Sequence, residues 1–268
     1  MSTPAVVVRM SRMASHGALV DHLRPLGSAV VAFSGGADST LVAWGAARAL
    51  GERALAVTAL SPLYPERELQ GVKKLIQVLG VRHRLIHSNE LEIPGFSKNP
   101  PNRCYSRKSK LFGELLDLAR EEGIPSVVEG STLDDDQDHR PGKKAIQELG
   151  IRSPLKETGF TKAEVRELSK TLELPTWDKP SFACLASRFP YGEEITEEGL
   201  KRVDQAEDFL QHFPFRMPAA ESAFLFLHHG GEHRPDERRH AQRRGQNHGR
   251  GDRIALVRHG GRSPAPFL

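Results

Sequence analysis

The sequence predicts an α/β protein built on a doubly wound parallel β-sheet, followed by a small, degenerate C-terminal region. Two observations predict this fold class. Short apolar runs alternate with segments of helical periodicity from residue 29 to residue 172, as in a parallel sheet covered by helices on both faces. A glycine-containing turn also joins the first expected strand to the first expected helix, at the sheet edge where such folds bind ligands.

The expected elements follow from these patterns in chain order. Residues 29–33 are apolar and partly β-branched, which suits a strand buried on both faces, and a helix over 39–50 follows the glycine turn. Thr161 and Glu164 fit a capping box at the start of a later helix. Further strands are expected at 53–60, 81–87 and 124–129, and further helices at 66–79, 111–119, 161–172 and 196–213.

The turn after the first strand reads as a phosphate-binding loop, with the sequence Ser34-Gly35-Gly36-Ala37-Asp38-Ser39. Its glycines let backbone amides approach an anion, and the following helix N-terminus attracts negative charge. The two serines add hydroxyl donors, while Asp38 can cap amides or help to hold Mg²⁺ on phosphates. The loop lacks the lysine of a Walker motif. An ordinary loop closure is the alternative interpretation.

A second candidate segment, residues 130–142, leaves the fourth expected strand at the same sheet edge. Gly130 and Thr132 open it, and four carboxylates follow at positions 134, 135, 136 and 138. Clustered carboxylates repel one another unless a cation or solvent balances them. The segment is therefore either a loop that faces a metal ion, with Asp135 as a ligand beside Asp38, or a solvated acidic turn.

The third candidate is Cys184, within a segment dense in polar and turn residues that we call the cysteine segment (residues 177–192). Lys179 and Arg188 flank the thiol, and cations close to a thiol favour its reactive thiolate form. Apolar neighbours surround the same cysteine, so a small buried side chain is the alternative.

Composition narrows the class of protein. Two cysteines exclude a disulfide framework and favour a reducing cytoplasm. No apolar run approaches the roughly 20 residues of a membrane span, and no secretory signal is seen, so no membrane association is expected. Nine arginines and four acidic residues follow residue 227 and give that end +5, so the rest of the chain carries about −1 of the net charge of +4. The remainder is nearly neutral, which argues against a nucleic-acid partner.

Four motifs together resemble the LarE family of ATP-dependent sacrificial sulfur transferases, members of the PP-loop ATP pyrophosphatase superfamily. They are residues 34–39, the acidic run with Arg140-Pro141-Gly142, Arg152-Ser153-Pro154-Leu155, and above all Pro180-Ser181-Phe182-Ala183-Cys184-Leu185-Ala186-Ser187-Arg188. The resemblance covers about residues 15–213. It implies a PP-loop domain of the adenine nucleotide alpha hydrolase type over 15–213, with an N-terminal extension over 1–14. Hydrophobic periodicity largely disappears beyond residue 214, so an atypical, poorly ordered tail is expected over 214–268.

The resemblance also implies a reaction on a small-molecule substrate. ATP, with Mg²⁺, would adenylate a carboxylate of pyridinium-3,5-biscarboxylic acid mononucleotide, and Cys184 would displace AMP as the nucleophile. Cleavage of the cysteine's C–S bond would leave a thiocarboxylate and a dehydroalanine, as a step in nickel-pincer cofactor synthesis for lactate racemase. Relatives form hexamers, which implies a homo-oligomer.

The resemblance also assigns residue roles. Ser34, Gly35, Gly36, Asp38 and Ser39 would hold the phosphates, Asp38 and Asp135 the Mg²⁺, and Gly130 and Thr132 would face the adenosine. Arg188 is the candidate contact for a substrate phosphate or carboxylate, with a structural salt bridge as the alternative.

Two departures from the family pattern matter. Some relatives carry C-x-x-C where this chain has Cys104 and Arg107, so the cluster-free, sacrificial form is expected, with Cys104 structural or non-essential. The Arg- and His-rich tail does not resemble the relatives' C-terminal domain. A tRNA thiolase, an amidotransferase-type synthetase and an inactive nucleotide-binding module remain as alternatives.

Overall fold

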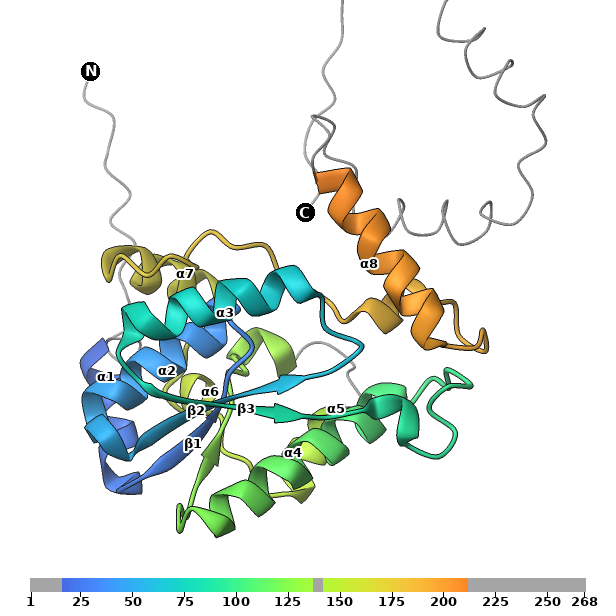
Figure 1. Ribbon diagram of the computed structural model, residues 1–268. Coiled ribbons are helices and arrows are strands. Elements are labelled where there is room, and N and C mark those ends of the chain that lie inside the picture. The colour runs from blue at the N-terminus through green and yellow to red at the C-terminus, as the bar shows by residue number, and fades with distance from the viewer. Residues whose placement is uncertain (1–15, 137–141, 212–268) are drawn as a thin grey trace, which may run out of the picture. The chain divides into compact units, whose positions relative to one another are not determined.

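The computed structural model describes residues 16–136 and 142–211 (Figure 1). Its centre is a parallel four-stranded sheet in the order β3-β2-β1-β4. The strands are β1 (Ala29–Ala32), β2 (Ala54–Leu60), β3 (Arg82–His87) and β4 (Val127–Val128). Val30 of β1 lies between Leu55 of β2 and Val127 of β4. The chain therefore moves outward from β1 in both directions, which confirms the doubly wound parallel sheet.

Helices alternate with these strands, largely as the apolar periodicity predicts. The capping box is present, because Thr161 accepts a hydrogen bond from the Glu164 amide and the Glu164 carboxylate accepts one from the Thr161 amide. The α-helices are α1 (His16–Leu23), α2 (Ala37–Leu50), α3 (Glu66–Leu79), α4 (Arg103–Glu121), α5 (Gly142–Glu148), α6 (Pro154–Glu157), α7 (Lys162–Thr171) and α8 (Glu197–Gln211).

Two elements differ from their expected bounds for physical reasons. Helix α4 begins at Arg103, well before the expected residue 111. The sequence did not predict this start, because the first two turns of the helix are polar and carry no apolar stripe. Strand β4 has only two residues instead of the expected 124–129. The Ile124 amide instead donates to the Ala119 carbonyl in the last turn of α4, and the Glu129 amide donates to the Arg152 carbonyl.

The sheet separates two apolar cores, as successive side chains of a strand point to opposite faces. Val31 packs on one face with helices α1, α2, α3 and α7, whereas Val30 packs on the other with α4 and α5. Both valines are 0% exposed. Full burial of such a side chain contributes about 1.5–3 kcal/mol, so the strand that leads into the phosphate loop is firmly held.

Parts of the earlier expectations lie outside the described residues. These parts are the N-terminal extension 1–14, most of the acidic turn after residue 136 and the tail 214–268. Within the described part of the chain, no helix is both long and apolar enough to cross a membrane.

Candidate active site

The phosphate loop connects β1 to α2 and is closed by Ser39. The Ser39 hydroxyl donates to the Gly36 carbonyl at 3.2 Å and accepts from the Ser34 amide at 3.3 Å. Helix α2 begins after Gly36 without a side-chain cap. The first amides of this helix are therefore directed to a site that suits an anion.

Gly35 is required by its surroundings as well as by its backbone. Its φ of +71° lies in the left-handed region, and a Cβ placed there would lie 2.8 Å from Cγ2 of Val72. Val72 is a fully buried residue of α3. Helix α3 therefore packs against the phosphate loop, and the contact leaves no room for a side chain at position 35.

The chain after β4 packs directly on this loop. A Cβ on Gly130 would lie 3.0 Å from the Ser39 amide nitrogen, so the glycine permits a close approach of two backbones. Thr132 is 0% exposed and donates to Oδ2 of Asp135 through both its amide, at 2.9 Å, and its hydroxyl, at 3.0 Å. In this structure the Thr132 hydroxyl thus orders the acidic segment.

The pKa values of Asp38 and Asp135 are shifted in opposite directions. Burial raises the pKa of Asp38 to about 6, with Lys162 opposing the shift and Asp135 adding to it. Burial also acts to raise the pKa of Asp135, but hydrogen bonds from Thr132 and the Lys162 ammonium at 3.1 Å outweigh it and lower that pKa. A cation beside Asp38 would offset the cost of its burial.

These carboxylates fit Mg²⁺ better than a metal held by protein ligands alone. Across residues 16–136 and 142–211, no group of three or more His, Cys, Asp or Glu side chains is arranged to hold a metal ion. Magnesium typically takes one or two carboxylates and completes its shell with water and substrate phosphates. Asp38 and Asp135 can supply that share.

The cysteine segment contacts the phosphate loop although the two are far apart in the sequence. Lys179 Nζ donates to the Gly35 carbonyl at 3.0 Å and pairs with Oε2 of Glu68 at 2.6 Å. The Leu185 amide donates to the Leu63 carbonyl at 3.1 Å. Cys184 is half-buried between these two attachments. The fold therefore brings together the two motifs that the sequence singles out.

Arg188 lies in a buried ion-pair cluster in this structure. Its Nε donates to Glu207 at 2.6 Å, and the two side chains are 7% and 5% exposed. Arg67 also binds Glu207, at 2.8 Å, and lies on the Phe182 ring, as Arg188 does. Arg188 donates to the Ala183 carbonyl as well, at 3.0 Å. This geometry is that of the structural alternative, and a substrate contact stays a prediction.

Sequence reasoning missed several residues of the site. The Tyr64 hydroxyl donates to the Ser34 carbonyl, and burial together with the Glu68 charge raises the pKa of Tyr64. Asn99, 0% exposed and at φ 52°, donates to the carbonyls of Phe189 and Pro190 and so anchors the end of the cysteine segment. An asparagine in a Pro-rich loop suggests a turn, but no local pattern indicates a partner 90 residues away.

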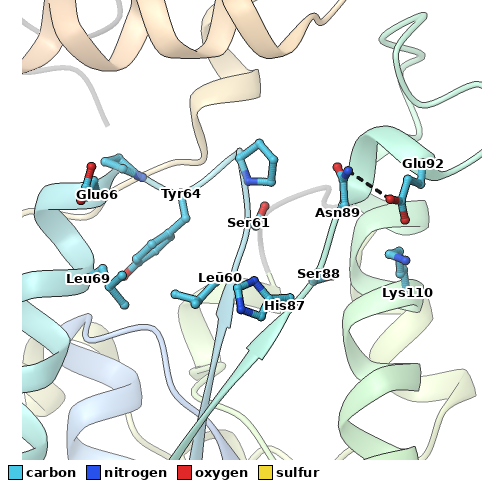
Figure 2. A pocket seen from close by; sticks show the side chains of 12 residues that line it. Leu60, Ser61, Tyr64, Glu66, Leu69, His87, Ser88, Asn89, Glu92 and Lys110 are labelled. Carbon is cyan, nitrogen blue, oxygen red and sulfur yellow. Dashed lines mark hydrogen bonds between the residues drawn. The ribbon is translucent and has the colours of Figure 1, made fainter.

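Tyr64 is one of the residues that line a pocket of about 560 Å³ (Figure 2). The pocket lies where β2 and β3 end, between α3 and α4, with His87, Asn89 and Lys110 in its wall. A smaller pocket of about 200 Å³ reaches from Tyr64 to Leu185 and α8. Tyr64, whose hydroxyl donates to the Ser34 carbonyl, lines both pockets.

Comparison with known proteins agrees with this geometry. The NAD synthase family profile matches residues 20–96, which contain the phosphate loop. A GMP synthase from Aeropyrum pernix is 30% identical over 171 residues, which are 57% of this chain and 33% of that one. These matches place the first half of the chain among the PP-loop proteins, whose enzymes use ATP.

Two further relatives match over more of their length. An uncharacterised protein of Synechocystis sp. is 46% identical over 197 residues, or 74% of each chain. The pyridinium-3,5-bisthiocarboxylic acid mononucleotide synthase of Lactiplantibacillus plantarum is 36% identical over 198 residues, which are 74% of this chain and 72% of that one. The chain therefore belongs to the pyridinium-3,5-bisthiocarboxylic acid mononucleotide synthase (LarE) family of the PP-loop ATP pyrophosphatase superfamily.

Proposed function

We propose that this protein transfers the sulfur of Cys184 to a carboxylate that ATP has activated, on pyridinium-3,5-biscarboxylic acid mononucleotide. The observation that carries this proposal is the contact between the phosphate loop and the cysteine segment, through Lys179 and Gly35. Cys184 is five residues from that contact, which supports its role as the nucleophile toward an adenylate formed at the loop. The name of the Lactiplantibacillus plantarum relative supports the choice of substrate.

In the first step the substrate carboxylate attacks the α-phosphorus of ATP, and pyrophosphate leaves. The amides at the start of α2, with Ser34 and Ser39, bind the departing phosphates, and Gly35 and Gly36 leave room for them. Gly130 lets the chain after β4 approach the same place. Mg²⁺, held by Asp38 and Asp135, would neutralise part of the pyrophosphate charge. The product is an acyl adenylate, which has a good leaving group.

In the second step the Cys184 thiolate attacks the acyl carbon, and AMP leaves to give a thioester. A base then removes the Cα proton of Cys184, the Cβ–Sγ bond breaks, and the electron pair stays on sulfur. The substrate departs as a thiocarboxylate and the chain retains dehydroalanine, so each polypeptide acts once. Arg188 orders the segment through the Ala183 carbonyl. The product would serve the synthesis of the nickel-pincer cofactor of lactate racemase.

Intact mass spectrometry tests the proposal. Incubation with ATP, Mg²⁺ and the biscarboxylate should lower the protein's mass by one H₂S, and peptide mapping should place dehydroalanine at position 184. Omitting ATP should prevent the change. An unchanged mass with thiolated tRNA would support a tRNA thiolase, and ATP binding without any product would support an inactive nucleotide-binding module.

Family membership also supports a cytoplasmic location and a homo-oligomer. Light scattering after size-exclusion chromatography tests the oligomeric state. A monomeric mass at working concentrations would contradict the oligomer.

A further inference from the structure

The contact between Lys179 and the phosphate loop does more than join two motifs. Lys179 Nζ has two acceptors, the Gly35 carbonyl at 3.0 Å and the Glu68 carboxylate at 2.6 Å. The Lys179 and Glu68 side chains are 25% and 17% exposed, so this pair is less screened than a surface salt bridge. Glu68 belongs to α3, the helix whose Val72 supports Gly35.

The cysteine segment is held on both sides of its thiol. Upstream, the Arg166 guanidinium donates to the carbonyls of Trp177 and Lys179, at 3.0 and 2.8 Å, while the Lys179 side chain holds the phosphate loop. Downstream, Leu185 is bound to Leu63. From Lys179 to Cys184 the chain extends at most about 18 Å. The position of the thiol relative to the loop therefore depends on the Lys179 attachment.

We propose that Lys179 is a positioning residue that keeps Cys184 within reach of the acyl adenylate. This inference rests on the proposed function. Glu68 neutralises the ammonium and fixes it on the Gly35 carbonyl, so Lys179 acts through geometry. Without this attachment the loop can still bind ATP and form the adenylate, but the thiol is no longer held beside it. Water then hydrolyses the adenylate to carboxylate and AMP. A misplacement of about 1 Å can slow a reaction about 100-fold.

The test compares two products in Lys179→Met and Lys179→Arg: AMP, and thiocarboxylate per polypeptide. The wild-type protein should form about one AMP for each thiocarboxylate. In Lys179→Met, AMP formation should stay within about 3-fold while thiocarboxylate formation falls about 10- to 100-fold, as expected for lost orientation. Lys179→Arg keeps a donor for both acceptors and should recover part of the transfer. Glu68→Gln should lie between wild type and Lys179→Met.

Lys170→Met is the matched control. The Lys170 ammonium lies over the Trp177 ring, 4.7 Å from the ring centre. The substitution therefore removes a nearby lysine whose contact is with this ring and leaves the Lys179 attachment in place. It should keep the wild-type ratio of the two products. Circular dichroism checks that each variant folds, and if Lys179→Met does not fold, the Arg and Glu68 variants decide the question.

Two results would overturn the inference. One is a Lys179→Met protein with the wild-type product ratio. The other is an equal loss of AMP and thiocarboxylate with a raised Kd for ATP, which would make Lys179 a phosphate ligand. If the wild-type protein itself forms no thiocarboxylate, the proposed function fails, and this outcome is distinct from both.

Discussion

The phosphate loop and the cysteine segment are held in place in different ways. Ser39 closes the loop through Ser34 and Gly36, all within six residues, and a buried strand and a helix flank it. The cysteine segment has no regular structure before residue 185, and its contacts reach residues 63, 68, 99 and 207. A motif with local contacts can be read from a short sequence, whereas a segment with distant contacts depends on the completed fold.

The largest effect is expected at Cys184, the proposed nucleophile. Cys184→Ser should abolish thiocarboxylate formation, because a hydroxyl offers no sulfur to transfer, while ATP-dependent AMP formation at the loop continues. Cys104→Ser is the control, since Cys104 lies on α4 and has no assigned role in the chemistry. Product analysis by mass spectrometry measures both. Thiolated product at the normal yield from Cys184→Ser would refute the proposed sulfur source.

The phosphate loop should be disrupted by one methyl group. Gly35→Ala places a Cβ 2.8 Å from Val72 at a φ of +71°, so ATP-dependent pyrophosphate release should fall, by about 100-fold if the amides shift by 1 Å. Gly27→Ala has the same φ and no atom within 4 Å of the added Cβ. Because its ψ of −52° lies outside the left-handed helical region, the substitution should cost about 1–3 kcal/mol of stability, but it should leave pyrophosphate release unchanged. Equal release from both variants would mean that the loop tolerates displacement.

The ion pairs around the cysteine segment should matter for stability. Glu207→Gln leaves the buried Arg188 guanidinium without its carboxylate, which should lower the free energy of unfolding by about 3 kcal/mol and Tm by about 6–12 °C. Glu197→Gln removes a carboxylate from an exposed pair with Lys201 and should leave Tm unchanged. Thermal unfolding followed by circular dichroism measures both, and similar Tm values would argue against a structural role for the Arg188 pair.

The smallest effect is a stabilisation that depends on pH. Burial raises the pKa of Asp38 from 3.8 to about 6, so its neutral form is favoured by folding. That contribution is complete below pH 3.8 and is lost as the pH rises through about 6. The side chain of Asp38→Asn stays neutral at every pH. Without Mg²⁺, the free energy of unfolding of this variant should therefore exceed that of the wild type by about 2–3 kcal/mol at pH 7.5 and match it near pH 4.

Asp21→Asn is the control for this pH dependence, because Asp21 is 68% exposed and pairs with Arg24 at the surface. Thermal unfolding at both pH values compares the two variants. A destabilised Asp38→Asn protein at pH 7.5 would show that the carboxylate is well compensated in the fold.

Much of the fold follows from local patterns. The expected strands and the longer helices appear, because each carries its own apolar periodicity or run, and the capping box of Thr161 and Glu164 is a purely local device. The short helices α1, α5 and α6 were not predicted, since four to eight residues give too few turns for a periodic signal. Helix α4 was predicted too short because its polar first turns resemble a loop.

The candidate site divides along the same line. Ser34, Gly35, Gly36, Asp38, Ser39 and Cys184 are recognisable from residue type and spacing. The parts played by Lys179, Glu68, Asn99 and Glu207 are not, because each is defined by a partner distant in the chain. Arg188 was identified from its chemistry, but only the fold gives it a buried carboxylate partner.

The sequence alone determined an α/β chain with a phosphate loop at the end of its first strand and one cysteine among cations. Glycine backbone freedom, helix dipoles and apolar periodicity act over a few residues, so the features that depend on them can be predicted from the sequence. Tertiary structure decided that Lys179 meets Gly35 and that Arg188 meets Glu207. Such pairings depend on how strands and helices pack, because the folded core determines which polar groups, distant in the sequence, lie next to one another in a partly buried site.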